Sequence, residues 1–356
     1  MVERFKSIVV GRGMMGAAAA RYLALQGEGV AVIGPDEPTD WSNHHGVFAS
    51  HYDEARITRT IDSDPIWARL ANRSIARYGE IAAESGIDFY SEVGCLIVGP
   101  KRGGQDPYEE KNAGYVNPRR LVEAQSLLAE KAGARVIRRT AVSVREEGGL
   151  AIVTTDDGAV YTAERVLVAA GGFSINENLV PRPLDLKVYG RTVAFFEIPD
   201  EDLAAYSGMP SLIHQPDDPT DHIYLLPPVR YPDGKTYLKI GGDPDDLELE
   251  TEPEIRAWFR RGGRLTTRDH LRRIISDLVP TLADAPLSMA ACVTSFTPEN
   301  YPAIGFASDH IAVLTGGCGA AAKSSDEIGR LGAELIQHGR IIDEAYGDVF
   351  RPVFRD

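Results

Sequence analysis

Three things are scarce in this sequence of 356 residues: cysteine, long apolar runs and basic charge. Its three cysteines, Cys95, Cys292 and Cys318, are widely spaced without a C-x-x-C pair, which argues against a structural zinc site and fits a reducing compartment. No stretch approaches about 18 uninterrupted apolar residues, so the sequence predicts no membrane-spanning helix. The net charge of -14 argues against broad nucleic-acid binding, which needs a basic surface.

What is present is typical of a globular protein with two domains. Hydrophobic residues make up 43% and charged residues 25% of a chain long enough to bury two cores. The first residues lead straight into a predicted strand, with no apolar signal-peptide core. We therefore expect a cytoplasmic protein, a monomer or small homo-oligomer, without a membrane or nucleic-acid partner.

A glycine fingerprint near the start organises the chain. Residues 8–10 are apolar and β-prone, and Gly11, Gly13 and Gly16 follow as Gly-x-Gly-x-x-Gly before an alanine-rich helix. In this motif the first glycine allows a tight turn, the second lets backbone approach a pyrophosphate, and the third lets helix and strand pack closely. Free N–H groups at the helix N-terminus then bind the phosphates. A second apolar run, 30–33, completes a β-α-β unit, so we predict a dinucleotide site.

The polar segment after this unit carries further candidate site residues. Three histidines lie close together here, His44, His45 and His51, and could in principle bind a metal. No acidic residue falls at a spacing typical of metal ligands, so no metal site is predicted. We instead expect a loop beside the cofactor. Arg56 and Arg59 stand three residues apart. If they lie on a helical turn, both guanidinium groups project to one side; a solvated charged turn is the alternative.

Helical and β patterns follow in turn. Helical periodicity predicts helices from residue 65 to 86 and from 118 to 133. The apolar pattern of residues 165–172 predicts a buried strand that ends in a glycine pair. Such a pair allows the backbone to lie close to a bound cofactor. From about residue 184, longer β runs predict an antiparallel sheet. Residues 252–279 read as mainly helical, with arginines on a solvated face.

The last segment repeats the strand, glycine-loop and helix pattern of the first. Residues 311–315 predict a buried strand, and Gly316, Gly317 and Gly319 form a loop before another helix. This strand, loop and helix N-terminus would meet the first site from the other side. The first domain is therefore expected to be discontinuous in sequence, with the β-rich part inserted.

Eight landmarks occur in a fixed order along the chain. They are the fingerprint 11–16, the motif 53–59 after Ser50 and His51, the helix start at Asn117 and Pro118, the strand 166–171, the segment 189–197, Lys239, Cys292, and a glycine-rich loop ending in Lys323. In this order they resemble the FAD-dependent D-amino-acid oxidase superfamily, most closely its monomeric sarcosine oxidase and N-methyltryptophan oxidase branch. The resemblance covers nearly the whole chain and implies FAD as the cofactor.

The resemblance completes the expected fold class, which is α/β. It implies a Rossmann-type, glutathione-reductase-like FAD-binding domain, discontinuous in sequence, with a mainly antiparallel-sheet α+β substrate domain. We assign residues 1–85, 116–184 and 287–356 to the FAD-binding domain. Residues 86–115 and 185–286 are assigned to the substrate-binding domain.

The resemblance also implies roles for individual residues. Arg59 and Lys323 match the pair that binds the substrate carboxylate, for which a guanidinium is well suited. Arg56 matches a guanidinium beside the flavin ring. Lys239 matches the lysine near flavin N5 that promotes reaction with O2, because a buried cation offsets developing negative charge. Tyr224 matches a tyrosine that lines the substrate pocket.

Two of the assignments have plainer alternatives. On pattern alone, Lys239 is a strand residue on the face opposite Leu238 and Ile240, facing solvent. Cys292 aligns with the residue that carries a covalent thioether to FAD, and the alternative is a small buried thiol. The residues expected to contact FAD are Gly11, Gly13, Met14, Met15, Gly16, Asp36, Ser50, His51, Arg56, Gly171, Cys292, Gly316, Gly317, Gly319 and Lys323.

The chain departs from the family pattern at several positions. The acid that usually ends the second strand and grips the ribose is replaced by Gly34, and Asp36 or Glu37 just beyond is expected to substitute. Thr294 and Asp243 stand where sarcosine oxidase often has tyrosine and histidine, which weakens a sarcosine-specific interpretation. The loop before Lys323 also lacks the usual Gly-His-Gly.

The hypothesis from sequence is an FAD-dependent amine oxidase for a secondary amine or N-substituted amino acid, such as an N-alkyl glycine. A hydride would pass to the flavin, the imine would hydrolyse to aldehyde and amine, and O2 would be reduced to H2O2. Three alternatives stay open. They are an NAD(P)-dependent dehydrogenase with the same fingerprint, an FAD-dependent dehydrogenase with another electron acceptor, and a non-catalytic flavin-binding subunit.

Overall fold

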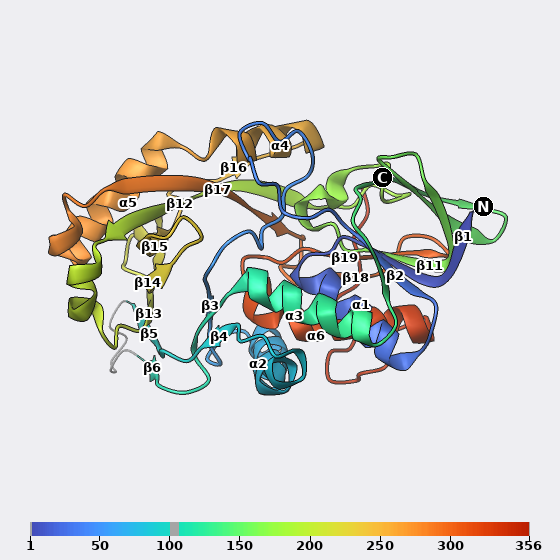
Figure 1. The fold of residues 1–356 in the computed structure, drawn as a ribbon, viewed down its shortest axis with the longest axis horizontal. Coiled ribbons are helices and arrows are strands. Elements are labelled where there is room, and N and C mark those ends of the chain that lie inside the picture. Colours follow the sequence, from blue (N-terminus) through green and yellow to red (C-terminus); the bar gives the residue numbers. More distant parts are fainter. Residues whose placement is uncertain (1, 100–106, 356) are drawn as a thin grey trace.

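The computed structural model describes residues 2–99 and 107–355. Figure 1 shows two large sheets along the long axis, one at the right beside both chain termini and one at the left. The helices are α1 (Met14–Gln26), α2 (Pro65–Ser85), α3 (Pro118–Lys131), α4 (Glu252–Arg261), α5 (Leu265–Leu278) and α6 (Ala321–His338), with short 3-10 turns at Gly171–Ile175, Asp200–Tyr206, Pro219–Asp221 and Pro280–Leu282.

The first sheet is wound in both directions from its central strand. Its strands are β1 (Glu3–Val10), β2 (Val30–Ile33), β8 (Arg135–Ile137), β9 (Ala141–Glu147), β10 (Leu150–Thr155), β11 (Val160–Val168), β18 (Ala303–Phe306) and β19 (Ile311–Thr315). The order is β18-β19-β11-β1-β2-β8, parallel except where β18 pairs with β19. Because β2 and β11 lie on opposite sides of β1, the switch point of the sheet is at the carboxyl end of β1.

Both faces of this sheet are buried. Val9 and Leu167 face α1 and α6, whereas Ile8, Val166 and Val168 face a layer that includes β9 and β10. Burial on both faces explains why these strands read as continuous apolar runs. The sheet therefore offers a rigid edge at the carboxyl ends of β1 and β11.

Local signals place the predicted helix ends. The Asp64 carboxylate accepts a hydrogen bond from the Trp67 N–H at 2.9 Å, and α2 ends at Gly86, whose φ of 75° is left-handed. The Asn117 side chain accepts from the Arg120 N–H at 3.0 Å at the start of α3. Side-chain caps and left-handed glycines are the usual ends of helices, and both predicted helices are confirmed.

The second sheet is mixed but mainly antiparallel. Its strands are β5 (Cys95–Val98), β6 (Tyr108–Glu109), β12 (Lys187–Ile198), β13 (Ser211–His214), β14 (Ile223–Arg230), β15 (Thr236–Gly241), β16 (Leu247–Glu248) and β17 (Leu287–Phe296). The order is β16-β12-β15-β14-β13-β5-β6, and β17 pairs with β12. Only β5 and β13, among the described pairs, run parallel in this sheet.

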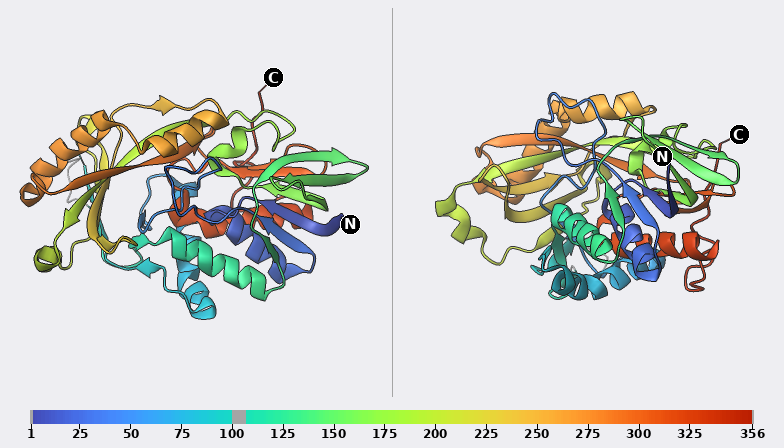
Figure 2. Two further views of the ribbon diagram at one scale, coloured as in Figure 1. Left: turned by 45° about the horizontal axis from the view of Figure 1, so that its top comes forward. Right: turned by 45° about the vertical axis from the view of Figure 1, so that its right-hand side comes forward.

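Helices α4 and α5 cover one face of the second sheet (Figure 2). Leu238 and Ile240 of β15 pack against Leu271 and Ile275 of α5. The predicted helical run 252–279 is thus two helices, separated at Gly262, whose φ is 76°. Their apolar residues face the sheet, in agreement with a solvated arginine face.

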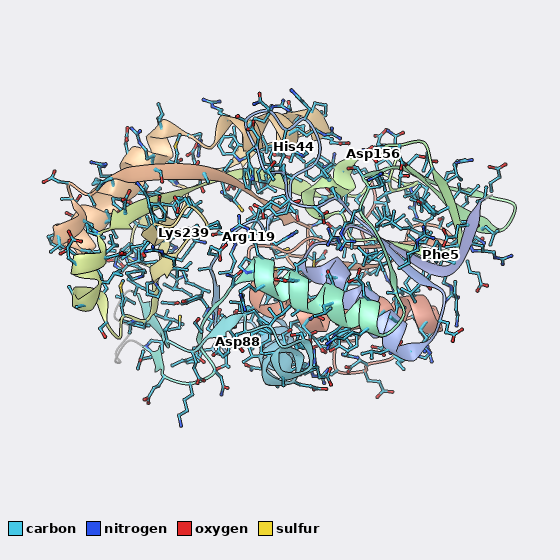
Figure 3. All side chains as sticks on the ribbon, viewed as in Figure 1. Phe5, His44, Asp88, Arg119, Asp156 and Lys239 are labelled. Carbon is cyan, nitrogen blue, oxygen red and sulfur yellow. The ribbon has the colours of Figure 1, made fainter. Side chains whose placement is uncertain are left out.

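The opposite face of β15 meets the segment before β3 (Arg56–Thr58). Lys239 lies on this face, as the alternation of the strand predicts, but its side chain is only 1% exposed. The alternative in which Lys239 faces solvent is therefore wrong, because its amine donates to the Asp53 carboxylate at 2.7 Å. Figure 3 shows Lys239 within the second-sheet region and Arg119 at the start of α3.

A third, small sheet contains β3 (Arg56–Thr58), β4 (Tyr90–Ser91) and β7 (Gly114–Val116). Residues 56–58 are therefore a strand, and the conditional expectation of a helical turn is wrong. Tyr115 of β7 pairs with Ile57, which fixes this segment in an extended form. The two nearby arginines consequently reach separate partners, described below.

Two of the segments assigned from the sequence contain strands of the second sheet. Within 86–115, β5 and β6 are strands of the second sheet, and residues 100–106 lie outside the described part. The segment 287–356 begins with β17, which pairs with β12 along its whole length. By hydrogen bonding β17 is a strand of the second sheet, and the chain returns to the first sheet only at β18.

Candidate functional site

One cavity lies at the carboxyl ends of β1 and β11 and reaches β17 of the second sheet. The fingerprint and the C-terminal glycine loop both border it, so the structure brings these two distant segments together. The predicted residues that line it are Gly11, Gly13, Met14, Met15, Ser50, His51, Arg56, Gly171, Cys292, Gly317 and Gly319. Four of the residues expected to contact FAD are not among its lining: Gly16, Asp36, Gly316 and Lys323. The other predicted site residues, Arg59, Tyr224 and Lys239, do not line it either.

The fingerprint glycines are required by close backbone contacts. A Cβ at Gly11 would lie 2.3 Å from the Ala169 carbonyl oxygen, and one at Gly16 would lie 1.9 Å from the Gly11 oxygen. Gly11 also has a φ of 108°, which is strained for other residues. Gly16 is therefore required by its contact with the turn, whereas a Cβ at Gly13 would lie 3.8 Å from His51 Nδ1, an ordinary van der Waals distance.

Two helix N-termini border the cavity. Helix α1 starts after Gly13, with no side-chain cap and no acidic residue in its first turn. Helix α6 starts after Ala320, also without a side-chain cap, and Ala321 and Ala322 line the cavity. Uncapped N–H groups and the helix dipole favour a bound anion, such as a pyrophosphate.

The end of β2 explains the missing acid. A Cβ at Gly34 would lie 2.7 Å from both the backbone nitrogen and the Cβ of Arg12. Any residue larger than glycine would therefore require Arg12 or its backbone to shift. Asp36 instead forms an ion pair with Arg12 and lies 3.5 Å from Arg138, with its side chain 61% exposed. Glu37 is held by Arg119 at 2.7 Å. Neither acid points into the cavity in this arrangement.

Buried polar atoms without partners mark the cavity as a ligand site. Within the described chain, His51 Nδ1 and Arg12 Nε have no hydrogen-bond partner, and both residues line the cavity. Burial, together with the positive charges of Arg12, Arg119 and Arg56, lowers the pKa of His51 to about 3. His51 is therefore neutral at pH 7 and suited to a hydrogen bond with a bound cofactor.

Asp53 is the centre of a buried cluster that we call the inner cluster: Asp53, Arg56 and Lys239. Its carboxylate accepts from Lys239 Nζ at 2.7 Å, pairs with the Arg56 guanidinium, and accepts from the Tyr231 hydroxyl at 2.8 Å. Burial and then the charge of Arg56 lower the pKa of Lys239 well below its usual value, and Cys292 opposes this effect. The cluster therefore brings a lysine of β15 and an arginine of β3 to one carboxylate.

Arg56 connects the inner cluster to the cavity. Its Nη2 donates to the Ser50 carbonyl at 2.9 Å and lies 3.6 Å from Cys292 Sγ. Cys292, half-buried on β17, lines the cavity, and its carbonyl accepts from Trp258 Nε1 at 2.9 Å. Strand β17 therefore holds the thiol at the wall of the cavity, beside a guanidinium.

Tyr224 lies on β14 next to Lys239. Lys239 Nζ is 5.7 Å from the centre of the Tyr224 ring, and burial raises the pKa of the Tyr224 hydroxyl to about 12. A Cβ at Gly241 would lie 2.4 Å from the Tyr224 hydroxyl oxygen, so the glycine makes room for the ring. Tyr224 is thus placed against the inner cluster.

Arg59 and Lys323 meet around a second carboxylate, in what we call the outer cluster: Arg59, Asp62 and Lys323. Lys323 Nζ donates to Asp62 Oδ2 at 2.8 Å, and Arg59 Nη2 lies 3.3 Å from the same oxygen. Burial raises the pKa of Asp62, but the hydrogen bond and charge of Lys323, with Arg59, outweigh it and leave the pKa below its usual value. Asp62 is ionised in this setting.

Glu109 supports the loop that carries the outer cluster. Its carboxylate accepts from the Thr60 N–H at 3.1 Å and the Ile61 N–H at 3.0 Å, and also from the Thr60 hydroxyl. Two carboxylates, Asp62 and Glu109, therefore balance the two cations of this region. Neither of these carboxylates was assigned a role from the sequence.

Two residues at the departures from the family pattern behave differently. Thr294 lines the cavity, and its hydroxyl accepts from Arg191 Nε at 3.0 Å. Asp243 is not among the lining residues; it accepts from the Thr192 N–H at 3.2 Å and lies 3.6 Å from Arg264. Burial raises the pKa of Asp243 to about 6, against the opposing charge of Arg191.

Sequence reasoning did not assign Asp53, Asp62 or Arg12. The signal for the two acids was the repeated spacing of an aspartate three residues from an arginine, Asp53–Arg56 and Arg59–Asp62. Over residues 2–99 and 107–355, no group of three or more metal-ligating side chains is found, and no helix is long and apolar enough to cross a bilayer.

A family model described as FAD dependent oxidoreductase matches residues 6–112 and 101–335. The chain belongs to this family. FAD is therefore the cofactor, in place of the nicotinamide alternative. The uncapped helix ends, the glycine cradle and the unpartnered His51 and Arg12 nitrogens of the cavity fit such a group.

Known relatives match most of the length of the chain at low identity. A monomeric sarcosine oxidase from Bacillus sp. (strain NS-129) is 25% identical over 398 aligned positions, which span 96% of this chain and 95% of the relative. An L-saccharopine oxidase from Schizosaccharomyces pombe (strain 972 / ATCC 24843) is 23% identical, spanning 83% of this chain and 74% of the relative.

Solved structures with the same fold cover the chain end to end. NikD, described as an unusual amino acid oxidase essential for nikkomycin biosynthesis, has a TM-score of 0.78 at 18% identity, covering 100% of this chain and 99% of its own. Amadoriase I from Aspergillus fumigatus, a fructosyl amine:oxygen oxidoreductase, has a TM-score of 0.76 at 19% identity, covering 99% and 90%. The expected fold class is confirmed.

Proposed function

We propose that this FAD-dependent oxidoreductase is an amine oxidase that acts on the CH–NH group of a secondary amine or N-substituted amino acid. An N-alkyl glycine is the model substrate. Sequence relatives named for the oxidation of amino compounds support the reaction class. We expect it to work in the cytoplasm as a monomer or small homo-oligomer, with the amine and O2 as its partners.

The observation that carries the proposal is the outer cluster. An arginine and a lysine from different segments hold one carboxylate, that of Asp62, next to the cofactor cavity. Lys323 directly follows Ala322, which lines the cavity, and Arg59 lies three residues beyond Arg56, which also lines it. A site that already holds a carboxylate between two cations is chemically fit for the carboxylate of an amino acid.

The residues of this chain would bind and orient the substrate. Arg59 and Lys323 would hold its carboxylate, and Tyr224 would line the space beside the reacting amine. When bound, FAD supplies the acceptor for the hydride removed from the carbon next to nitrogen. Arg56 at the cavity wall, and Lys239 on the same carboxylate of Asp53, would supply positive charge that stabilises negative charge developing in the reaction.

The overall reaction predicts three products in equal amounts. N-methylglycine, water and O2 would give formaldehyde, glycine and H2O2, since the C–N bond of the intermediate imine breaks on hydrolysis. Measuring all three products from the purified holoenzyme tests the proposal. Consumption of the amine without an aldehyde, or no consumption of any secondary amine in a panel, would contradict it.

A second candidate is an FAD-dependent dehydrogenase that passes electrons to a carrier. The observation in its favour is Asp53, because its carboxylate partly cancels the positive charge that Lys239 and Arg56 would offer to O2. Turnover with a dye acceptor that exceeds turnover with O2 by about tenfold or more would select this candidate. Comparable rates with H2O2 formation would select the oxidase.

We also propose that Cys292 is the covalent attachment point for FAD. Its support is the position of the half-buried thiol at the cavity wall, 3.6 Å from Arg56 Nη2. Acid-precipitated protein should remain yellow if the thioether exists. Colour that passes completely into the supernatant would show that the flavin is bound without a covalent link.

A further inference from the structure

Asp62 occupies the position in which a substrate carboxylate would sit. Its Oδ2 accepts from Lys323 Nζ at 2.8 Å and lies 3.3 Å from Arg59 Nη2, so one oxygen contacts both cations. Its Oδ1 accepts from the Asp64 N–H at 3.2 Å. Asp62 therefore satisfies the cations with a carboxylate of the chain itself.

The surroundings of the outer cluster allow exchange. The Asp62 side chain is 11% exposed and Arg59 is 20% exposed, so water reaches both groups, whereas Lys323 is 6% exposed. Asp62 lies in the loop between β3 and α2 and not within a helix or strand. A charged group on a short loop is the kind of ligand that a free carboxylate can replace.

Charge balance sets the cost of adding a second carboxylate. Asp62 and Glu109 already neutralise Arg59 and Lys323, and Glu109 is fixed by the Thr60 and Ile61 N–H groups. A substrate carboxylate that enters while Asp62 stays would bring three carboxylates to two cations, and like charges at this distance repel. The substrate must therefore displace Asp62 or bind weakly.

We propose that Asp62 is an internal competitor for the substrate carboxylate and sets the preference of the enzyme between amines with and without a free carboxylate. This inference rests on the proposed function. Asp62 disfavours compounds whose carboxylate is their main anchor, and favours amines that carry a neutral ester, amide or hydroxyl group in its place.

The direct test is a binding titration that needs no turnover. Acetate and acetamide are titrated into the holoenzyme and followed by the flavin absorption spectrum. Asp62→Asn keeps the size of the side chain and the oxygen that accepts from Asp64, but removes the competing charge. It should lower the Kd for acetate by about tenfold or more, the scale of one charge-assisted hydrogen bond, and leave the Kd for acetamide unchanged.

Two control variants isolate the charge at this position. Asp62→Glu keeps the carboxylate and should bind acetate within about threefold of the parent. Asp277→Asn removes the same charge from an exposed position on α5 and should change neither Kd. Acetate binding that is no tighter in Asp62→Asn than in the parent, including no detectable binding in either protein, overturns the proposal.

Oxidation kinetics add a second readout. With N-methylglycine, Asp62→Asn should lower KM by about tenfold with little change in kcat, whereas KM for its methyl ester should not fall. A rise of KM for both compounds would mean that Asp62 contacts the substrate amine, and would overturn the proposal. If no amine is oxidised, the proposed function fails, while the acetate titration still decides the role of Asp62.

Discussion

The inner and outer clusters have the same composition and different surroundings. Each contains an arginine from the segment around β3, a lysine from a distant element, and an aspartate three residues from the arginine. In the inner cluster the Lys239 side chain is 1% exposed, and Asp53 also accepts from the Tyr231 hydroxyl. In the outer cluster Lys323 is 6% exposed, Asp62 11% and Arg59 20%, so each residue is slightly more exposed than its inner counterpart.

The difference teaches which carboxylate is permanent. Asp53 has four partners: Lys239, Arg56, the Tyr231 hydroxyl and the Glu54 N–H at 2.8 Å. Removing it would leave two buried cations without a counter-charge, which is costly. Asp62 has three partners: Lys323, Arg59 and the Asp64 N–H. The larger number of partners makes Asp53 the fixed counter-ion, and under the proposal above Asp62 is the exchangeable one.

The largest expected effect is on stability. Asp53→Asn should lower the free energy of unfolding by about 3–5 kcal/mol, because Lys239 and Arg56 lose a buried partner. Asp62→Asn, the matched substitution in the outer cluster, should cost about 2 kcal/mol, the scale of one hydrogen bond to a charged group. Urea unfolding of the two holoproteins measures both values. Equal losses would remove the distinction between the clusters.

Lys239→Met tests the function of the inner cluster. Methionine has an unbranched side chain of similar length to lysine but lacks its amine, so the substitution removes the basic group next to Arg56. We expect oxidation of the reduced enzyme by O2 to slow by about 100-fold, the scale of one preorganised charge contact, with a much smaller effect on reduction by the amine. Stopped-flow measurement of the two half-reactions separates them. Equal slowing of both would assign Lys239 to structure alone.

Arg59→Ala tests the outer cluster in the same way. Loss of one charge-assisted contact should raise KM for N-alkyl glycines by about 10- to 100-fold. The KM for a carboxylate-free secondary amine should stay within about threefold. Steady-state kinetics with the two compounds gives both values. An unchanged KM for the N-alkyl glycine would mean that its carboxylate is held elsewhere.

Asp243 extends the comparison to a carboxylate with a distant cation. Its pKa is raised from 3.8 to about 6, so the protonated form is favoured in the folded state. Its contribution to stability is then present below about pH 4 and is lost as pH rises to about 6. Asp243→Asn should raise stability by about 1 kcal/mol at pH 7 and by nothing at pH 4. A variant that is less stable at pH 7 would contradict this.

The sequence predicted the fold well where local patterns repeat. The fingerprint, the capped starts of α2 and α3, and the alternation of Lys239 with Leu238 and Ile240 each follow from rules that act within a few residues. The order of the landmarks then predicted the family and FAD. These features depend on the spacing of residues along the chain, which can be read directly from one sequence.

The parts that could not be predicted depend on contacts between distant segments. The strand form of residues 56–58 follows from pairing with β7, and the burial of Lys239 follows from the approach of Asp53. Gly34 replaces the expected acid because Arg12 lies against it. Asp62 meets Lys323 across 261 residues, which no local pattern encodes.

The most direct test of the account is anaerobic reduction of the flavin. Holoenzyme is mixed without O2 with secondary amines, N-alkyl glycines, primary amino acids and 2-hydroxy acids, and the flavin absorbance is followed. Bleaching by secondary amines or N-alkyl glycines, and not by 2-hydroxy acids, is the predicted result. Bleaching by a hydroxy acid alone, or by none of these compounds, would contradict oxidation at a CH–NH group.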